Sequence, residues 1–214
     1  MTGMSYQPPR LTIRAPRRRL ATGVDRCYVR FAVMGDGATL RSKGPASREW
    51  PGLLARVVGT THDLSCCDTR SAGATTYDVR RAQLRVAVAH RPHVVCLAAG
   101  LADVRDADWD PAAVRAHLVH CAQVLSHRGA VLLTTRQGAG RLGRAGSWCS
   151  ESRRGRIRQL DDLYDELHER FGTIHLDPRS TAGGVRPSAT ELTRRFAQEL
   201  TRHGLELPSA ALAR

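Results

Sequence analysis

Two aspartates and two arginines in this sequence are of types that could bind a polar ligand or move a proton. Asp36 and Asp103 each come shortly after an apolar run, Arg136 follows another, and Arg186 lies just ahead of the last helix-like segment. Carboxylates and guanidinium groups that share one rim can hold a polar or anionic ligand, or take part in acid–base chemistry. The residue after Asp36, where a strand could deliver a nucleophile, is Gly37, which has no side chain.

The elements that must position these residues follow from the hydrophobic pattern. Short, continuously apolar runs alternate with stretches whose apolar residues recur at helical spacing. The runs predict strands at residues 28–34, 62–67, 93–98, 130–135 and 173–176. The periodic stretches predict helices at residues 50–58, 76–90, 111–127, 156–171 and 187–203.

Local signals support two of the helix ends and one loop. Asp110 is a predicted N-cap with Pro111 at the first helical position, and Gly204 is placed to end the last helix. Residues 138–150, rich in glycine and arginine, predict a loop.

Apolar strands separated by helices predict a parallel sheet covered on both faces. We therefore expect a three-layer α/β/α sandwich with a flavodoxin-like, five-stranded parallel sheet. In such a sheet, functional groups gather beyond the carboxyl ends of the strands. This places Asp36, Asp103, Arg136 and Arg186 around one rim. No glycine-rich phosphate-binding motif follows the first strand, so no nucleotide cofactor is expected.

The length of 214 residues suits one domain, which we place at residues 27–206. Residues 1–26, rich in proline and arginine, predict a flexible basic tail, and residues 207–214 a short C-terminal tail. The formal net charge is +13, and Lys43 is the only lysine. Such an arginine bias is typical of a high-GC bacterium. Basic residues cluster in residues 1–30 and 136–158, so a contact with an anion or a nucleic acid is the alternative to a solvated surface.

The six cysteines form no metal-binding or redox spacing and are interpreted as structural thiols in a reducing compartment. Cys66 and Cys67 lie near a strand end, but His62 and His93 lie at the opposite ends of their predicted strands and leave them without a base. His117 and His120 share a helix without a third ligand, so no metal site is expected. No apolar run is long enough for a membrane span and the N-terminus lacks a signal-peptide core, which favours a cytoplasmic protein.

Four segments, taken in order, resemble the sequence blocks of the SGNH hydrolases, also called the GDSL esterase/lipase family. The resemblance covers residues 28–203, and it implies the fold expected above. The four segments are MGDGATL, SAGATTYDVRRAQL, HRPHVVCLAAGLADV and GGVRPSATEL.

The family's chemistry, as the resemblance implies it, uses a serine nucleophile, a histidine base oriented by an aspartate, and an oxyanion hole that includes a glycine amide and an asparagine. Here the serine position is Gly37 and the asparagine position is Ala102. The aspartate and histidine positions are Gly183 and Arg186. The oxyanion glycine is retained as Gly73. His175 cannot replace the base, because it falls within the fifth predicted strand.

Three hypotheses follow for the function. The first is a pseudoenzyme without ordinary serine esterase activity, a ligand-binding or scaffolding module for an anionic small molecule or an acidic protein partner. The second is an esterase or acyltransferase with a rearranged site around Asp36, Asp103 and Arg186, although these aspartates could equally brace loops. The third is a basic protein associated with nucleic acid.

Overall fold

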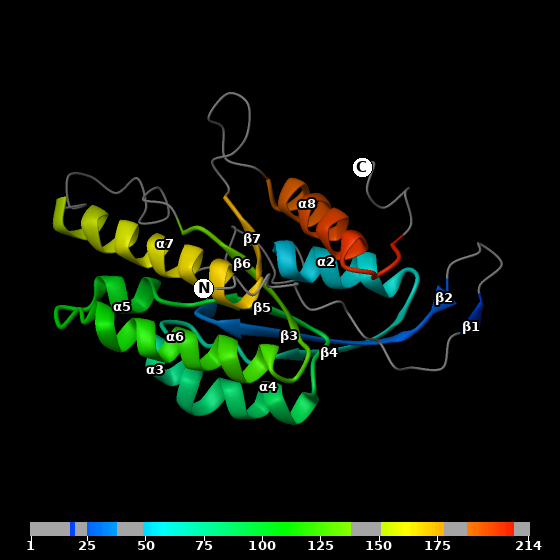
Figure 1. The fold of residues 1–214 in the computed structure, drawn as a ribbon, viewed down its shortest axis with the longest axis horizontal. Helices are drawn as coiled ribbons and strands as arrows, with labels where there is room; N and C mark the ends of the chain where they lie inside the picture. Colours follow the sequence, from blue (N-terminus) through cyan, green and yellow to red (C-terminus); the bar gives the residue numbers. More distant parts are fainter. Residues whose placement is uncertain (1–17, 20–24, 38–48, 138–150, 178–187, 208–214) are drawn as a thin grey trace, which may run out of the picture.

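A computed structural model describes residues 18–19, 25–37, 49–137, 151–177 and 188–207 of the chain (Figure 1). Its centre is a five-stranded sheet in which all strands run parallel, in the order β4-β3-β5-β6-β7. This is the flavodoxin-like order that the sequence predicts. The strands are β3 (Tyr28–Gly35), β4 (Asp63–Asp68), β5 (Val94–Ala98), β6 (Val131–Thr135) and β7 (Ile174–Leu176).

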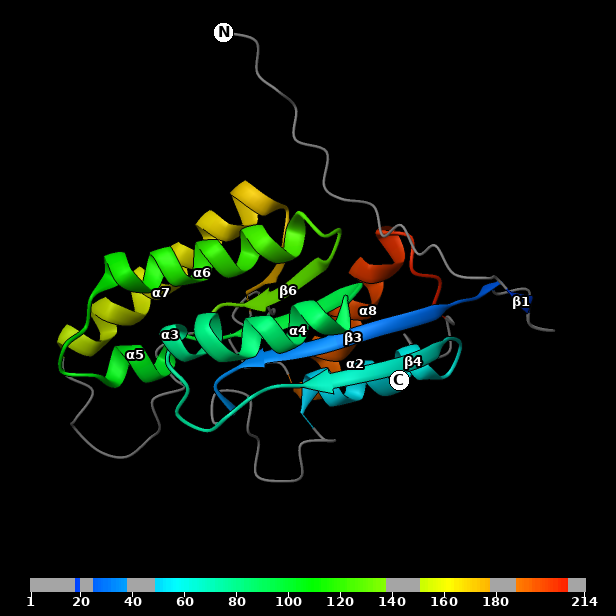
Figure 2. The ribbon, with the colours of Figure 1, turned by 90° about the horizontal axis from the view of Figure 1, so that it is seen from below.

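Helices cover both faces of the sheet, which makes the three layers expected from the sequence. On one face lie α2 (Trp50–Gly59) and α8 (Ala189–Arg202), which contact each other. Figure 2 looks at the opposite face. The helices of that face are α3 (Thr76–Asp78), the π-helix η2 (Val79–Gln83), α4 (Leu84–His90), α5 (Leu101–Arg105), α6 (Pro111–Ser126) and α7 (Glu151–Phe171).

Two hydrophobic clusters hold these layers together, one on each side of the sheet. Every residue of β5 and β6 is buried, so these central strands contribute side chains to both clusters. On the α2 and α8 side, Trp50 stacks on Phe196 with ring centroids 4.4 Å apart. Burial on both faces explains why the central strands read as continuously apolar rather than alternating.

The predicted helix ends are confirmed where the structure describes them. Asp110 caps α6 by accepting hydrogen bonds from the amides of Ala112 and Ala113. Gly204 follows α8 with a positive φ of 94°, the conformation that favours glycine at this place.

Some elements differ from the sequence-based expectation. Helix α5 was not predicted, because five residues are too few to show a helical period. Helix α7 begins at Glu151, ahead of the predicted start, with this acidic residue in its first turn where the helix dipole favours negative charge. Within the predicted tail, β1 (Arg18–Arg19) and β2 (Asp25–Arg26) pair antiparallel. The tail and domain boundaries stay predictions.

None of the described helices combines the length and the apolar character needed to cross a membrane.

The carboxyl end of β3 offers a test of this packing. Gly35 has φ +125°, and a Cβ on it would lie 1.9 Å from the carbonyl oxygen of Ala98. Gly129 has φ +79° but open space around it. We expect Gly129→Ala to cost about 1 kcal/mol of unfolding free energy from backbone strain alone. Gly35→Ala must also displace β5, so we expect a loss of more than about 3 kcal/mol.

Urea denaturation of the two variants measures the difference. Equal losses in both variants would show that β3 and β5 do not approach as closely as described.

Candidate functional site

The carboxyl end of β3 holds the position at which a nucleophile is expected. Strand β3 ends at Gly35, and the amide of Asp36 donates to the Ala98 carbonyl oxygen at 2.9 Å. The Asp36 side chain is fully buried, and its Oδ1 accepts a hydrogen bond of 2.8 Å from the amide of Gly73. A buried carboxylate needs such donors, because an unsatisfied charge inside a protein is costly. Asp36 therefore ties β3 to the turn that follows β4.

Gly37 has room for a side chain that it does not possess. Its amide donates to the carbonyl oxygen of Ser71 at 3.0 Å. A Cβ at this position would meet its nearest neighbour, the amide nitrogen of Ala72, at 3.6 Å, an ordinary contact. Steric crowding therefore does not require glycine here. The glycine at this position is therefore a property of the sequence and is not required by the described packing.

The amide groups that would serve an oxyanion hole are engaged in the fold. The Gly73 amide donates to Asp36, and the Gly37 amide donates to Ser71. Ala102, on α5, carries only a methyl group at the predicted asparagine position. In this arrangement the two amide hydrogens and the Ala102 side chain provide no donor aimed at a developing oxyanion.

Asp103 braces a helix start and does not pair with Asp36. Its carboxylate accepts hydrogen bonds from Thr76, with the amide nitrogen at 2.9 and 3.2 Å and Oγ1 at 2.8 Å. His117 Nδ1 lies 3.3 Å from the same hydroxyl. Asp103, on α5, thus fixes the N-terminal turn of α3. The donors to its carboxylate all belong to Thr76.

Gln83 holds the last residue of β3 from the side of η2. Its Oε1 accepts from the amide of Gly35 at 2.7 Å, and its Nε2 donates to the carbonyl oxygen of Gly35 at 3.1 Å. The π-helical segment places the amide there, in keeping with the occurrence of π-bulges at functional positions. Gln83 lies in the segment SAGATTYDVRRAQL, but the sequence does not reveal Gly35 as its partner.

A buried ion pair lies beside Gly37. Arg70 reaches Glu49 with an NH1–Oε2 distance of 2.5 Å and Asp68 with an NH2–Oδ2 distance of 2.6 Å. The Arg70 and Glu49 side chains are 9% and 2% exposed. The hydrogen bonds that Arg70 donates to Asp68 and Glu49 raise its pKa, and this effect outweighs that of its burial. Sequence analysis missed this cluster, because Glu49 precedes α2 and only the fold brings it to Arg70.

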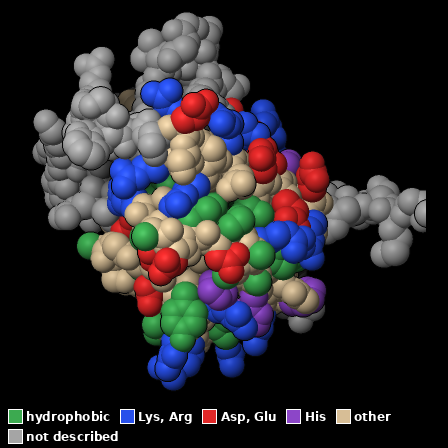
Figure 3. All heavy atoms as spheres, turned by 90° about the vertical axis from the view of Figure 1, so that its left-hand side faces the viewer, with side chains coloured by type: hydrophobic (Ala, Val, Ile, Leu, Met, Phe, Trp, Pro, Cys, Tyr) green, Lys and Arg blue, Asp and Glu red, His purple; other side chains and the backbone are tan. Residues whose placement is uncertain are grey.

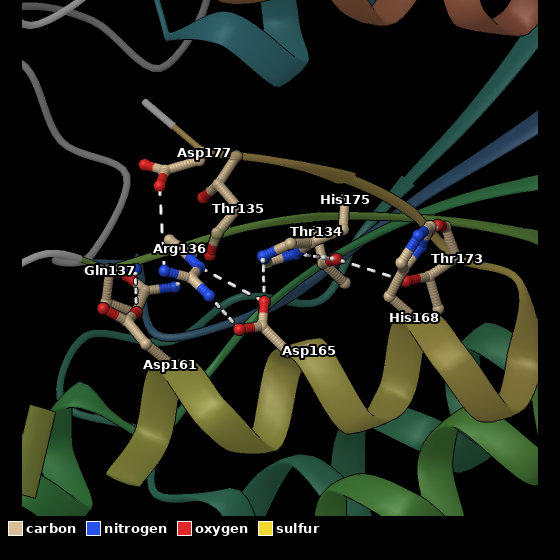
Figure 4. Close-up of polar contacts among 10 residues, drawn as sticks. All are labelled: Thr134, Thr135, Arg136, Gln137, Asp161, Asp165, His168, Thr173, His175 and Asp177. Carbon is tan, nitrogen blue, oxygen red and sulfur yellow. Dashed lines mark hydrogen bonds and ion pairs between the residues drawn. The ribbon is translucent and has the colours of Figure 1, made fainter. Parts of the chain in front are cut away.

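Arg136, predicted as a ligand-binding residue, pairs with acids of the chain itself (Figure 4). Its Nε donates to Asp165 Oδ1 at 3.2 Å, its NH2 contacts Asp165 Oδ2, and its NH1 lies 3.7 Å from Asp177 Oδ2. Two carboxylates therefore surround this guanidinium. Arg136 holds α7 against the carboxyl ends of β6 and β7, and its charge is largely balanced.

His175 lies within β7, as predicted, and completes the cluster of Figure 4. Its Nδ1 is 2.8 Å from Thr134 Oγ1, and its Nε2 is 3.4 Å from Asp165 Oδ1, without a well-directed hydrogen bond. Hydroxyl, imidazole and carboxylate stand in the order of a catalytic triad. Thr134 is 0% exposed, however, so no substrate reaches its hydroxyl. Burial lowers the pKa of His175 to about 4.

Several predicted site residues lie outside the described residues. Gly183 and Arg186, the aspartate and histidine positions, belong to residues 178–187. The predicted loop 138–150 is also outside, together with Trp148 and Cys149. The structure therefore brings Asp36, Gly37 and Gly73 together, sets Asp103 at a neighbouring helix start, and directs Arg136 toward α7.

The described residues at the carboxyl end of the sheet include both acidic and basic side chains (Figure 3). Figure 3 looks at the end of the molecule toward which β3 points in Figure 1, and acidic and basic side chains are interspersed there. The six segments outside the described part contain eleven of the 33 basic residues and none of the 20 acidic ones. The described residues thus carry 22 basic and 20 acidic side chains, a net charge of only +2.

No set of described histidine, cysteine and acidic residues is placed to hold a metal ion. A cavity of about 500 Å³ at the outer edge of β7 is lined by His168, His175, Glu199 and His203, among others. It lies near the ends of α7 and α8, where β7 begins, and so away from Gly37. The five described cysteines are thiols and form no disulfide.

Neither a protein-family model nor a curated protein sequence matches the chain. Solved structures do match. A putative lipolytic protein of the G-D-S-L family from Desulfitobacterium hafniense is 13% identical, with a TM-score of 0.59 over 80% of this chain and 99% of that one. The lipase/acylhydrolase from Enterococcus faecalis is 16% identical, with a TM-score of 0.58 over 84% and 97%. TesA is 19% identical, with a TM-score of 0.55 over 81% and 97%.

These similarities concern the fold, since the sequence identities are low. The chain has the SGNH hydrolase fold that the four sequence segments predict.

His175 makes the stability of the fold depend on pH. Its pKa of about 4 in the folded chain lies below the ordinary 6.5, so the unfolded chain binds more protons between these values. Stability present above pH 6.5 is therefore lost as the pH falls toward 4. The difference corresponds to about 3 kcal/mol. Between pH 7 and pH 4, the unfolding free energy of the wild type should fall by about 3 kcal/mol more than that of His175→Asn.

Urea denaturation at both pH values measures this loss, and the remaining histidines cancel in the comparison. Parallel pH profiles for the two proteins would mean that His175 is protonated as readily in the folded chain as in the unfolded one.

Proposed function

We propose that this chain is a pseudoenzyme on the SGNH hydrolase fold, a binding or scaffolding module without ordinary serine esterase activity. The proposal rests on Gly37, the residue at the nucleophile position after the carboxyl end of β3. Gly37 has space for a side chain and offers no nucleophilic atom, while its amide is engaged with Ser71. A serine–histidine mechanism needs an attacking oxygen and donors for the charge that develops.

The use of the two aspartates supports the same proposal. In an esterase with a rearranged site, Asp36 or Asp103 would have to act as a base or a nucleophile. Asp36 accepts from the Gly73 amide, and Asp103 accepts three hydrogen bonds from Thr76. Carboxylates that accept from the backbone in this way stabilise turns. The hydrogen bonds of Asp36 and Asp103 therefore favour a structural role for both residues over a catalytic one.

An anionic ligand is the class that the charge distribution favours. Residues 38–48, which follow Gly37 beyond the end of β3, contain three basic residues and no acid. Residues 138–150, after β6, and residues 178–187, after β7, contain two arginines each and no acid. All three connections start from the carboxyl edge of the sheet, where ligands of open α/β sheets bind. Arg186 belongs to the third connection. Arg136 is a weaker candidate, because Asp165 and Asp177 balance it.

Restoring the nucleophile alone should not restore catalysis. A Gly37→Ser side chain fits without a close contact, so we expect the unfolding free energy to change by less than about 1 kcal/mol. The histidine position remains Arg186, which stays protonated and cannot accept the serine proton. Hydrolysis of p-nitrophenyl acetate by the wild type, Gly37→Ser and the control Gly37→Ala should therefore be equally slow and should not saturate.

Saturable turnover by the wild type would contradict the pseudoenzyme proposal and favour a rearranged active site. Saturable turnover by Gly37→Ser alone would show that a base is present which the sequence does not reveal.

The proposed binding of an anionic ligand can be tested with citrate as the probe. At constant ionic strength, 10 mM citrate should raise the melting temperature of the wild type by a few degrees, as expected for a dissociation constant near 1 mM. Arg186→Gln should lose most of this shift. The matched control is Arg202→Gln, because Arg202 pairs with Glu199 near the end of α8.

Equal shifts in both variants would point to a general effect of citrate on a basic protein. The absence of a shift in the wild type would remove the support for a small carboxylate ligand.

A further inference from the structure

A cysteine and a histidine meet at the end of the sheet opposite to Gly37. Cys27 directly precedes β3, and His62 directly precedes β4. The two residues are 9% and 2% exposed. The Cys27 Sγ lies 3.2 Å from His62 Nδ1, and the Cys27 amide nitrogen lies 3.4 Å from the same atom. Parallel pairing of β3 with β4 brings the two strand starts side by side.

The chain fixes the proton on this imidazole. His62 Nε2 lies 2.7 Å from the carbonyl oxygen of Glu206. A carbonyl oxygen can only accept, so Nε2 carries the hydrogen and Nδ1 keeps its lone pair. Leu205 and Leu207, on either side of Glu206, are buried in the cluster that contains Cys27. The segment after α8 thus holds His62 with its basic nitrogen toward the Cys27 sulfur.

The described charged groups that act on His62 are Arg26, Asp63 and Glu206. Arg26 and Asp63, the neighbours of Cys27 and His62 in sequence, form an ion pair with an NH2–Oδ1 distance of 2.7 Å. Burial lowers the pKa of His62, and the Glu206 and Asp63 charges only partly oppose this effect. The imidazole is therefore neutral at pH 7 and able to accept a proton.

We propose that Cys27 and His62 form a thiol–imidazole centre at which hydrogen peroxide oxidises Cys27 to a sulfenic acid. The sulfur attacks one peroxide oxygen, so that an S–O bond forms while the O–O bond breaks. His62 Nδ1 takes the thiol proton and passes it to the departing oxygen, which leaves as water. Cys27 is oxidised and the peroxide is reduced, with no further reactant. This centre is independent of the proposed function at the β3 carboxyl end.

Cys66 is the internal comparison for this proposal. It lies on β4, is exposed, and has no histidine among its described hydrogen-bond partners. Partial loss of solvent around the thiol and the nearby Asp68 charge raise the pKa of Cys66, so its thiolate is scarce at neutral pH. If exposure decides reactivity, Cys66 reacts before Cys27. If the imidazole decides it, Cys27 reacts first.

His93 provides the matched control for His62. It precedes β5, and its Nδ1 accepts from the amide of Arg30, on β3, at 3.1 Å. Burial lowers its pKa as well. His93 therefore shares the position and the backbone contact of His62 and is half-buried, but its ring nitrogens contact Arg30 instead of a thiol.

The experiment treats the full chain with hydrogen peroxide, traps sulfenic acid with dimedone, and measures the labelling rate of each cysteine by peptide mass spectrometry. At pH 6.5 we expect Cys27 to be labelled at least about tenfold faster than Cys66. His62→Gln keeps an acceptor and a donor but removes the base, and should slow Cys27 at least about tenfold. His93→Gln should leave the rate unchanged.

The pH profile of the wild type tests the proposal without a substitution. The Cys66 rate should rise about tenfold for each pH unit up to its raised pKa, as its thiolate forms. The Cys27 rate should level off above the lowered pKa of His62. A Cys27 rate that does not exceed that of Cys66 at pH 6.5, or that follows the Cys66 profile, would overturn the proposal. So would an unchanged rate in a folded His62→Gln protein.

Discussion

The buried hydrogen bond between Asp36 and the Gly73 amide is the contact on which this end of the molecule depends. It joins the carboxyl end of β3 to the turn that leads into α3, across 37 positions of sequence. Gly35 must approach Ala98 too closely for any side chain, and Gln83 clamps the same residue through both of its backbone groups. These contacts fix where the chain leaves the sheet. The position of Gly37 follows from them.

The residues that support this fold are thus different from the positions at which reacting groups are expected. The residues that remain from the family pattern, Asp36, Gly73 and Asp103, all make hydrogen bonds that hold turns and helix starts. The positions that differ from the pattern, Gly37 and Ala102, are those that the resemblance assigns to the reaction. A chain that loses its supports unfolds, whereas one that loses its reacting groups keeps its stability. A protein can therefore retain the SGNH frame while its nucleophile position is glycine.

Charge is separated in a similar way. The described part of the chain is nearly neutral, and its conspicuous arginines are paired, Arg70 with Glu49 and Asp68, and Arg136 with Asp165 and Asp177. Most of the net charge of +13 belongs to segments that contain no acid. Paired arginines hold secondary structure elements together and contribute little to an external field.

The sequence by itself determined the order of strands and helices, the covered parallel sheet and the absence of the serine at Gly37. Hydrophobic period and block order are local properties, and residue identity needs no coordinates. Only the tertiary structure decided which groups are partners. Arg136 could be read as a ligand-binding residue until Asp165 was found beside it, and Cys27 was interpreted as a structural thiol until His62 was found at the neighbouring strand start. The carbonyl that orients His62 lies 144 positions away. A hydrogen bond depends on position and direction in space, and sequence spacing does not report either across such separations.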